Sequence, residues 1–246
     1  METDGRPLAE TVPAAQARGR SRSSRDFTGA RANAEADATL AAIHAAAAAA
    51  FREQGFAATS IDDVARRLGA TKGLVYHYYR SKDDLFLDVC RRGMELQIAA
   101  VQAPASSRER AVTRLRAMAE AHLAALIRHI DFQHAILQAV GRRPSGPAAQ
   151  EGGDGLAEII DARERYEQLF RRTLAEAVAQ GDLGGGADAS LTGRAFLSVL
   201  NAPVFWYRER ANETEADRRA LVRELALFAL RGAGASDAII EEEFGQ

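Results

Sequence analysis

The chain has 246 residues, 47% hydrophobic and 27% charged, so it can bury a substantial core as one large or two small domains. Its formal net charge of −2 excludes binding to nucleic acid through bulk positive charge alone. The single cysteine, Cys90, excludes an internal disulfide and a cysteine-rich zinc site, and we expect a buried thiol in a reducing cytoplasm. The sequence has no run of about 18 apolar residues and no signal-peptide core, so we expect no membrane segment.

Residues 1–36 are rich in Ala, Arg, Ser, Gly and Pro and contain almost no large apolar residues. Such a segment cannot bury enough apolar surface to offset the entropy lost on ordering, so we predict a disordered arm. Residues 18–31 of this segment carry five arginines and a single acidic residue, Asp26. An arm of this kind can lie in the minor groove of DNA, or it can remain a solvated tail without contacts.

Residues 37–85 have the pattern of a three-helix domain that contains a helix-turn-helix. An alanine-rich first helix is expected to end at Gly55. Ser60 is placed to cap a second helix whose third residue is Asp63, and a glycine follows the last apolar residue of that helix. Thr71 can cap a third helix after a break of only two residues, and so tight a turn between short helices is the helix-turn-helix signature.

The third of these helices is predicted to point Val75 and Tyr79 inward, because they lie four residues apart. Its other side presents basic, small and aromatic residues that suit a major groove. Lys82 begins the following helix, where a cation opposes the helix dipole, so we expect a phosphate nearby. The predicted DNA-binding residues are Ser60, Thr71, Lys72, Gly73, Leu74, Tyr76, His77, Tyr78 and Lys82.

The rest of the chain is predicted to be helical, so the expected fold class is all-α. Ser81 can cap a helix that reaches about residue 100, before a break at Pro104. Further helices are predicted from their apolar spacing, and the Gly- and Pro-rich stretch 141–155 is predicted to be a mobile loop. The predicted helices cover residues 108–130, 131–141, 157–180, 189–208 and 215–231. We assign 86–235 to a second, helical domain and 236–246 to an acidic tail.

Residues 51–85 resemble the TetR family of bacterial transcriptional regulators in both residue identity and spacing. The resemblance implies a repressor that binds a palindromic DNA operator and is released by a small apolar effector. The alternative for this stretch alone is a three-helix scaffold used for protein contacts. The resemblance is carried by Phe51, Gly55, Phe56, Thr59, Ser60, Ile61, Val64, Ala65, Leu68, Gly69, Ala70, Thr71, Lys72, Gly73, Tyr76, Tyr78, Tyr79, Ser81, Lys82 and Leu85.

The last two long predicted helices carry more apolar residues than one helix packed on one neighbour would hide. In TetR-family proteins such helices usually pair with those of a second subunit as a four-helix bundle, so the resemblance implies a homodimer. A monomer whose last two helices complete its own core is the alternative. The predicted dimerisation residues are Leu197, Leu200, Val204, Trp206, Leu221, Leu225 and Phe228.

Residues 200–209, LNAPVFWYRE, resemble a segment of TetR-type regulators of fatty-acid and steroid catabolism that respond to acyl-CoA thioesters. This implies an apolar tunnel for an acyl chain and cations for the CoA phosphates, for which Arg142, Arg143, Arg163 and Arg165 are candidates. Ordinary core packing of the aromatic residues and solvation of the arginines are the alternatives. The predicted effector-binding residues are Phe132, Ile136, Tyr166, Phe170, Phe196, Asn201 and Phe205.

Enzymatic function finds little support in the sequence. His122, His129 and His134 have no carboxylate or thiol beside them at metal-ligand spacing, so we predict no metal site, catalytic residue or cofactor. Gly-rich phosphate loops and an activated serine or cysteine are also missing from the pattern. Two other functions remain open: a DNA-binding protein without an effector, and a helical lipid-binding protein or enzyme with an incidental helix-turn-helix.

Overall fold

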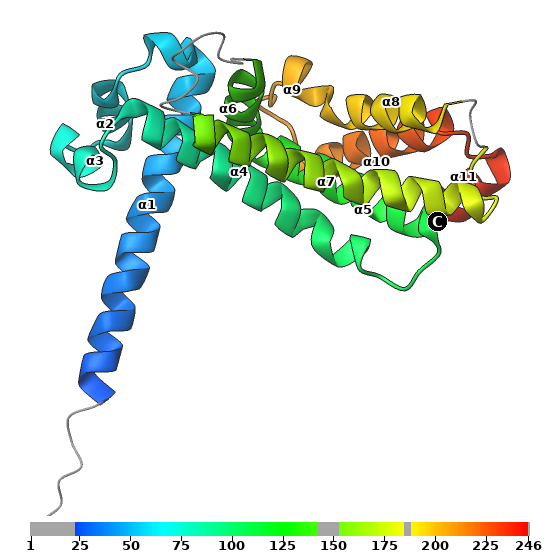
Figure 1. Cartoon of the computed structure of the whole chain (residues 1–246), viewed down its shortest axis with the longest axis horizontal. Helices are drawn as coiled ribbons and strands as arrows, with labels where there is room; N and C mark the ends of the chain where they lie inside the picture. The colour runs from blue at the N-terminus through cyan, green and yellow to red at the C-terminus, as the bar shows by residue number, and fades with distance from the viewer. Residues whose placement is uncertain (1–22, 142–152, 185–187, 246) are drawn as a thin grey trace, which may run out of the picture. The chain divides into compact units, whose positions relative to one another are not determined.

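The computed structural model describes residues 23–141, 153–184 and 188–245 (Figure 1). The chain forms two units, residues 1–39 and 40–246, and each is described by itself. Within the described ranges the regular secondary structure is helical, apart from one isolated bridge between Leu183 and Ala235. The prediction of an all-α fold is therefore confirmed.

The first helix, α1, spans Ser23–Ala58. The prediction of disorder up to residue 36 is therefore wrong for residues 23–36, while residues 1–22 lie outside the described part of the chain. Helix nucleation costs more than propagation, so the alanine-rich run that follows can extend a helix into a segment with few large apolar residues. The predicted interruption at Gly55 is confirmed by its left-handed φ of 77°.

Three further helices complete the N-terminal domain: α2 (Ile61–Leu68), α3 (Lys72–Tyr78) and the start of α4 (Lys82–Ala105). Three buried aromatic rings hold α1 against α4. The ring centroid of Phe86 lies 5.1 Å from that of Phe51 and 4.6 Å from that of Phe56. Edge-on aromatic contacts of this kind stabilise a small core beyond the apolar area they bury.

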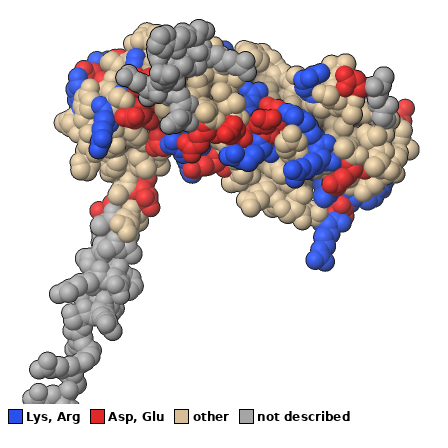
Figure 2. Space-filling view, viewed as in Figure 1, with Lys and Arg blue, Asp and Glu red and all other residues tan. Residues whose placement is uncertain are grey.

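Helix α4 continues into the C-terminal domain, where it packs against α5, α6 and α7 (Figure 1). It ends at Ala105, about one turn later than predicted, because Pro104 falls in the last turn, where the helix is about to end in any case. On the face drawn in Figure 2, basic and acidic side chains are mixed along α4 and α7. The helices that surround α4 are α5 (Ala111–Arg128), α6 (Ile130–Gly141) and α7 (Gly153–Ala179).

The single helix predicted over 189–208 is two helices, α8 (Ala189–Asn201) and α9 (Pro203–Trp206). The break has a simple cause, because Pro203 has no backbone N–H to donate and its ring clashes with the preceding turn. Helix α10 (Glu215–Gly232) packs against α5 and α8.

Residues 236–246 were assigned to an acidic tail, and this is corrected by α11 (Asp237–Phe244). Ile240 and Phe244 of α11 are buried. Glu243 accepts a hydrogen bond from Arg116 Nε on α5 at 2.8 Å. Part of the acidic charge therefore anchors the chain end to the C-terminal domain.

Gly93 sets the distance between α4 and α6. A Cβ atom added there would lie 2.8 Å from Ile136 Cδ1 and 3.1 Å from Phe132 Cβ. We predict that Gly93→Ala lowers the free energy of unfolding by about 1–3 kcal/mol, because α6 must move away from α4. Urea denaturation measures the change. Gly232→Ala is the control, since a Cβ there meets nothing within 4 Å, and an equal effect of both substitutions would contradict the close-packing argument.

Candidate functional site

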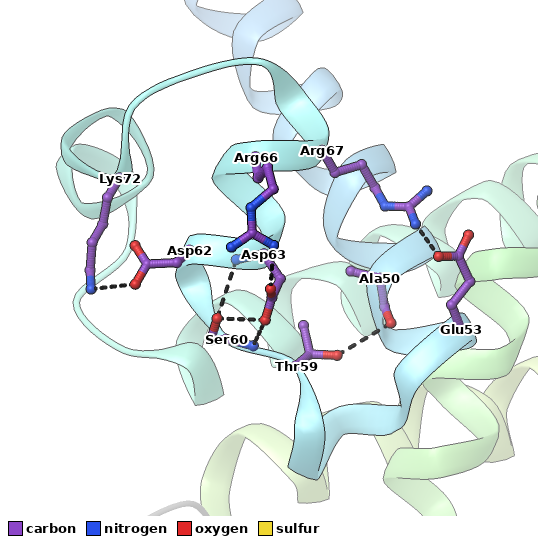
Figure 3. A network of polar contacts seen from close by, with 9 residues as sticks. All are labelled: Ala50, Glu53, Thr59, Ser60, Asp62, Asp63, Arg66, Arg67 and Lys72. Atoms are coloured by element: carbon purple, nitrogen blue, oxygen red, sulfur yellow. Dashed lines mark hydrogen bonds and ion pairs between the residues drawn. The ribbon is translucent and has the colours of Figure 1, made fainter.

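The turn between α2 and α3 is built as the sequence predicts (Figure 3). Ser60 Oγ accepts a hydrogen bond from Asp63 N at 3.2 Å, and Asp63 Oδ2 accepts one from Ser60 N at 2.9 Å, which completes a capping box. Gly69 ends α2 with a left-handed φ of 68°. Thr71 occupies the N-cap position of α3, but its side chain makes no capping hydrogen bond.

Helix α3 has one buried and one exposed side. Val75 and Tyr79 are buried, as predicted. Tyr76 is 47% exposed, and Lys72 and His77 are also exposed, so one side of this short helix presents a basic, an aromatic and an imidazole side chain to solvent. The remaining predicted residues are exposed at Ser60, Thr71 and Gly73 and half-buried at Leu74 and Tyr78.

Lys72 is held in place by its own domain. Its Nζ lies 2.9 Å from Asp62 Oδ2 (Figure 3). The same Nζ lies 5.5 Å from the centre of the Tyr76 ring. The hydrogen bond to Asp62 raises the pKa of Lys72. Because this ion pair is half exposed to solvent, a phosphate can replace the carboxylate at little cost.

Lys82 has a different environment from the one expected. Its Nζ donates hydrogen bonds to the carbonyl oxygens of Phe56 at 2.8 Å and Thr59 at 2.9 Å, and to that of Ala57 at 3.2 Å. These carbonyls follow the break in α1, where a cation is favourable. The expectation that Lys82 needs a phosphate is therefore corrected: the chain itself supplies partners for its three N–H donors.

The Tyr79 hydroxyl ties the end of α3 to two other helices. It donates to Asp88 Oδ2 on α4 at 2.6 Å and lies 2.7 Å from His44 Nε2 on α1, while His44 Nε2 lies 2.9 Å from Asp88 Oδ2. Burial acts to raise the pKa of Asp88, but hydrogen bonds from Tyr79, His44 and Arg91 together hold it below its usual value. Arg91 extends this cluster to Glu158 on α7 at 3.1 Å.

A cavity of about 430 Å³ lies between α4, α5, α6, α7, α8 and α9. Among the predicted effector residues, Ile136, Tyr166, Asn201 and Phe205 line it. Phe170 and Phe196 do not; they are buried in the core, where their ring centroids lie 6.3 Å apart. The full lining is Met94, Gln97, His122, Gln133, Ile136, Leu137, Arg163, Tyr166, Glu167, Arg194, Leu197, Ser198, Asn201, Val204 and Phe205.

Several polar residues of this wall escaped the sequence analysis, above all Gln97, Gln133 and Arg194. Gln97 and Gln133 are buried although they are amides. A glutamine on the apolar side of a predicted helix is the signal that could have found them, because a buried polar group needs a partner. His122 was considered in the sequence as a metal ligand and rejected, and the structure places it in the cavity lining.

His122 joins two neighbours at the cavity wall. Its Nδ1 lies 2.7 Å from Tyr166 Oη and 3.2 Å from Gln97 Nε2. Gln97 Nε2 can only donate, so we assign Nδ1 as the unprotonated acceptor of the neutral ring. Burial lowers the pKa of His122 to about 4, which keeps the ring neutral at pH 7.

A larger, open groove of about 1260 Å³ lies between α1, α5, α6 and α10, and Phe132 lines this groove rather than the smaller cavity. Seven arginines line it. Several of them are already paired, for example Arg52 with Asp131 at 2.6 Å and Arg116 with Glu243 at 2.8 Å. The smaller cavity is the better candidate for a ligand with an apolar body, because Ile136, Leu197 and Val204 line it. The buried polar residues Gln97, His122 and Gln133 lie in the same lining.

The predicted dimerisation residues divide into two groups. Leu197, Leu200 and Val204 are buried within the chain, so their assignment to a surface is corrected. Leu221 and Leu225 are half-buried. Trp206 and Phe228 are exposed, as an interface residue must be in a single protomer, and Leu191 and Phe205 add to the exposed apolar side chains of α8 and α9.

Burial of neutral His122 makes a prediction about pH. The unfolded chain takes up a proton at the ordinary histidine pKa of 6.5, while the folded chain does so only near 4. Acid therefore favours the unfolded state within this window, and folding stability falls as the pH drops from 6.5 to 4, by about 3 kcal/mol from this group. Urea denaturation of the native protein and His122→Asn at several pH values isolates this contribution. Parallel pH dependences of the two proteins would contradict it.

The fold and the exposed helix α3 define a helix-turn-helix DNA-binding protein with a separate helical domain around a cavity. The sequence profile described as "Bacterial regulatory proteins, tetR family" matches residues 43–89, and that described as "Tetracyclin repressor-like, C-terminal domain" matches residues 108–233. The chain belongs to the TetR family and is a DNA-binding transcriptional regulator. Members of this family are generally non-enzymatic.

Individual relatives agree with this assignment. The HTH-type transcriptional repressor KstR2 of Mycobacterium tuberculosis is 25% identical over 162 residues, which cover 66% of this chain and 78% of KstR2. The structure of the TetR family regulator PfmR from Thermus thermophilus is similar with a TM-score of 0.64 and 28% identity, covering 77% of this chain and 97% of PfmR. The structure of AibR in complex with isovaleryl coenzyme A and operator DNA is similar in fold, with a TM-score of 0.59 and 22% identity. The match covers 75% of this chain and 96% of AibR.

Two further observations concern membrane-spanning helices and metal sites. None of the helices in the described ranges is long and apolar enough to cross a membrane. The described residues also contain no group of three or more His, Cys, Asp or Glu side chains placed to hold a metal ion.

Proposed function

We propose that this protein is a homodimeric repressor that binds a palindromic operator and leaves it when an apolar effector, an acyl-CoA or a similar thioester, enters the C-terminal cavity. The observation that carries the proposal is the combination of an exposed recognition helix with a cavity that has both apolar and polar walls in one chain. A DNA-binding protein without an effector would have no use for such a cavity, and that is the competing function.

The DNA-binding half of the proposal rests on α3. Lys72 offers a charge to a phosphate or to guanine acceptors, Tyr76 and His77 can stack or form hydrogen bonds, and Gly73 allows a close approach of the backbone. A single helix-turn-helix makes few base contacts, so a two-fold dimer is needed to double the site. The exposed side chains Trp206 and Phe228 support an interface built from the last long helices.

The effector half rests on the cavity and on two relatives. AibR is described in complex with isovaleryl coenzyme A, and KstR2 is described as a ketosteroid transcriptional regulator. A CoA ester needs cations as well as an apolar wall, and the cavity has Arg163 and Arg194 in its lining. Arg165 is exposed and does not line it, and Arg142 and Arg143 lie outside the described residues.

Helix α4 supplies a physical route between the two sites. Met94 and Gln97 of α4 line the cavity, and Asp88 of the same helix holds the Tyr79 hydroxyl at the end of α3. A ligand changes operator affinity only if it binds the two arrangements of the dimer unequally. Tilting α4 would change the separation of the two recognition helices, and a displaced helix loses several base and phosphate contacts together.

We predict that Tyr76→Ala and Lys72→Ala abolish operator binding and leave helix content and dimer mass unchanged. The recognition helices of the dimer should contact sites about 34–36 Å apart or somewhat further. Operator fragments recovered from genomic DNA with the purified protein provide the probe for fluorescence anisotropy. Arg172 is exposed on α7 and lies outside the helix-turn-helix, so Arg172→Ala is the control for the loss of one positive charge. Tight binding by both α3 variants would rule out this helix as the DNA-binding element.

We further predict that an acyl-CoA weakens the operator complex by about 5- to 150-fold, which corresponds to a coupling of about 1–3 kcal/mol. The measurement is a titration of the protein–operator complex with acyl-CoAs of graded chain length. Free CoA and free fatty acids are the controls, because each carries only half of the proposed chemistry. If none of the esters changes operator affinity, the thioester proposal fails, while release by another small molecule would leave the repressor proposal standing.

A further inference from the structure

Two buried glutamine side chains on the wall of the smaller cavity have atoms without partners. Gln97 on α4 is 3% exposed and Gln133 on α6 is 7% exposed. Across the described part of the chain, Gln97 Oε1 and Gln133 Nε2 have no hydrogen-bond partner. A buried amide that stays unpaired is costly, so such groups in a ligand cavity indicate what the ligand must offer.

The contacts of His122 fix which atom of Gln97 is left over. Both Gln97 and Tyr166 approach the same ring nitrogen, Nδ1. Gln97 Nε2 can only donate, so a proton on Nδ1 would set two donors against each other, whereas an unprotonated Nδ1 can share its lone pair between the Gln97 N–H and the Tyr166 O–H. The carbonyl oxygen of Gln97 is therefore the free end, and it needs a donor. Gln133 Nε2, as an amide nitrogen, needs an acceptor.

We propose that the ligand of this cavity carries a hydroxyl, or another group that both donates and accepts a hydrogen bond, on its apolar body, and that Gln97 and Gln133 select it. The inference rests on the proposed function in one respect, namely that this cavity is the effector site. A saturated acyl chain would leave both amides unpaired. A thioester carbonyl only accepts, so it could serve Gln133 but not Gln97.

The other residues that line the cavity suit a ligand whose hydroxyl is attached to an apolar skeleton. Ile136, Leu137, Val204 and Phe205 give the cavity apolar sides, and its volume of about 430 Å³ lies in the lower part of the range of small-molecule sites. One polar group held among apolar walls gives selectivity, because a site built to bind a hydroxyl rejects the analogue that lacks it.

A pair of free fragments tests the inference without any CoA ester. Cyclohexanol and methylcyclohexane have nearly the same shape, and only the first carries a group that both donates and accepts a hydrogen bond. Binding to the intact protein is measured by the shift of its melting temperature with concentration. We expect cyclohexanol to bind at least about tenfold tighter. Equal binding, or tighter binding of methylcyclohexane, would overturn the inference and would mean that water already satisfies the two amides.

Variants of the two glutamines test the residues themselves. Gln97→Met and Gln133→Met keep the length of the side chain and remove its hydrogen bonds, so each should reduce the preference for cyclohexanol, and the double variant should abolish it. Gln102→Met is the matched control, since Gln102 is exposed on the same helix as Gln97 and lies outside the cavity lining. A double variant that retains the preference would contradict the role of these residues. If the double variant does not fold, the fragment comparison in the native protein still decides the inference.

A third comparison separates this inference from the thioester proposal. Hexanoyl-CoA is compared with the set of isomeric monohydroxyhexanoyl-CoAs, which carry the hydroxyl at successive carbons of the chain, by release of operator DNA. We expect at least one hydroxylated isomer to act at a concentration at least about tenfold lower than hexanoyl-CoA. If the fragments show the preference and no CoA ester releases DNA, the thioester proposal fails and the selection by Gln97 and Gln133 stands. If hexanoyl-CoA releases DNA as well as every isomer does, the selection fails and the thioester proposal stands.

Discussion

The half-buried carboxylate of Asp88 is the contact on which the placement of the recognition helix depends. Contacts from three helices meet there, because Asp88 on α4 accepts a hydrogen bond from the hydroxyl of Tyr79 at the end of α3 and lies within hydrogen-bond distance of His44 on α1. A carboxylate partly removed from water is stable only when hydrogen bonds and cations surround it. The position of α3 is therefore fixed by a polar requirement as well as by the packing of Val75.

Local chemistry explains why the helix-turn-helix could be predicted so closely from sequence. Capping by Ser60 and the left-handed end at Gly69 depend on residues three to nine positions apart, so they are visible in the chain itself. Lys82 could not be predicted in the same way. Its partners are carbonyl groups more than twenty residues earlier, and only the fold brings them together.

The residues that line the cavity could be predicted from the sequence only in part. Aromatic and aliphatic residues at helical spacing identify a buried face, but spacing does not distinguish a core from the wall of a cavity, so Phe170 was assigned to the cavity and lies in the core. The same uncertainty placed Leu200 at a subunit surface, although it is fully buried in one chain. The amides Gln97 and Gln133 were the residues that could have identified the cavity wall. A polar residue on the apolar face of a helix needs a hydrogen-bond partner, which a closely packed apolar core does not provide.

Gly93, in the middle of α4, determines how a movement of the cavity wall affects α4. Ile136 is at once part of the cavity lining and the residue that closes against Gly93, with no side chain between it and the α4 backbone. Side chains between helices usually absorb small displacements by changing rotamer, and here none is available on the α4 side. A displacement of Ile136 toward α4 is therefore passed to the backbone of α4 and is not absorbed by a side chain of that helix.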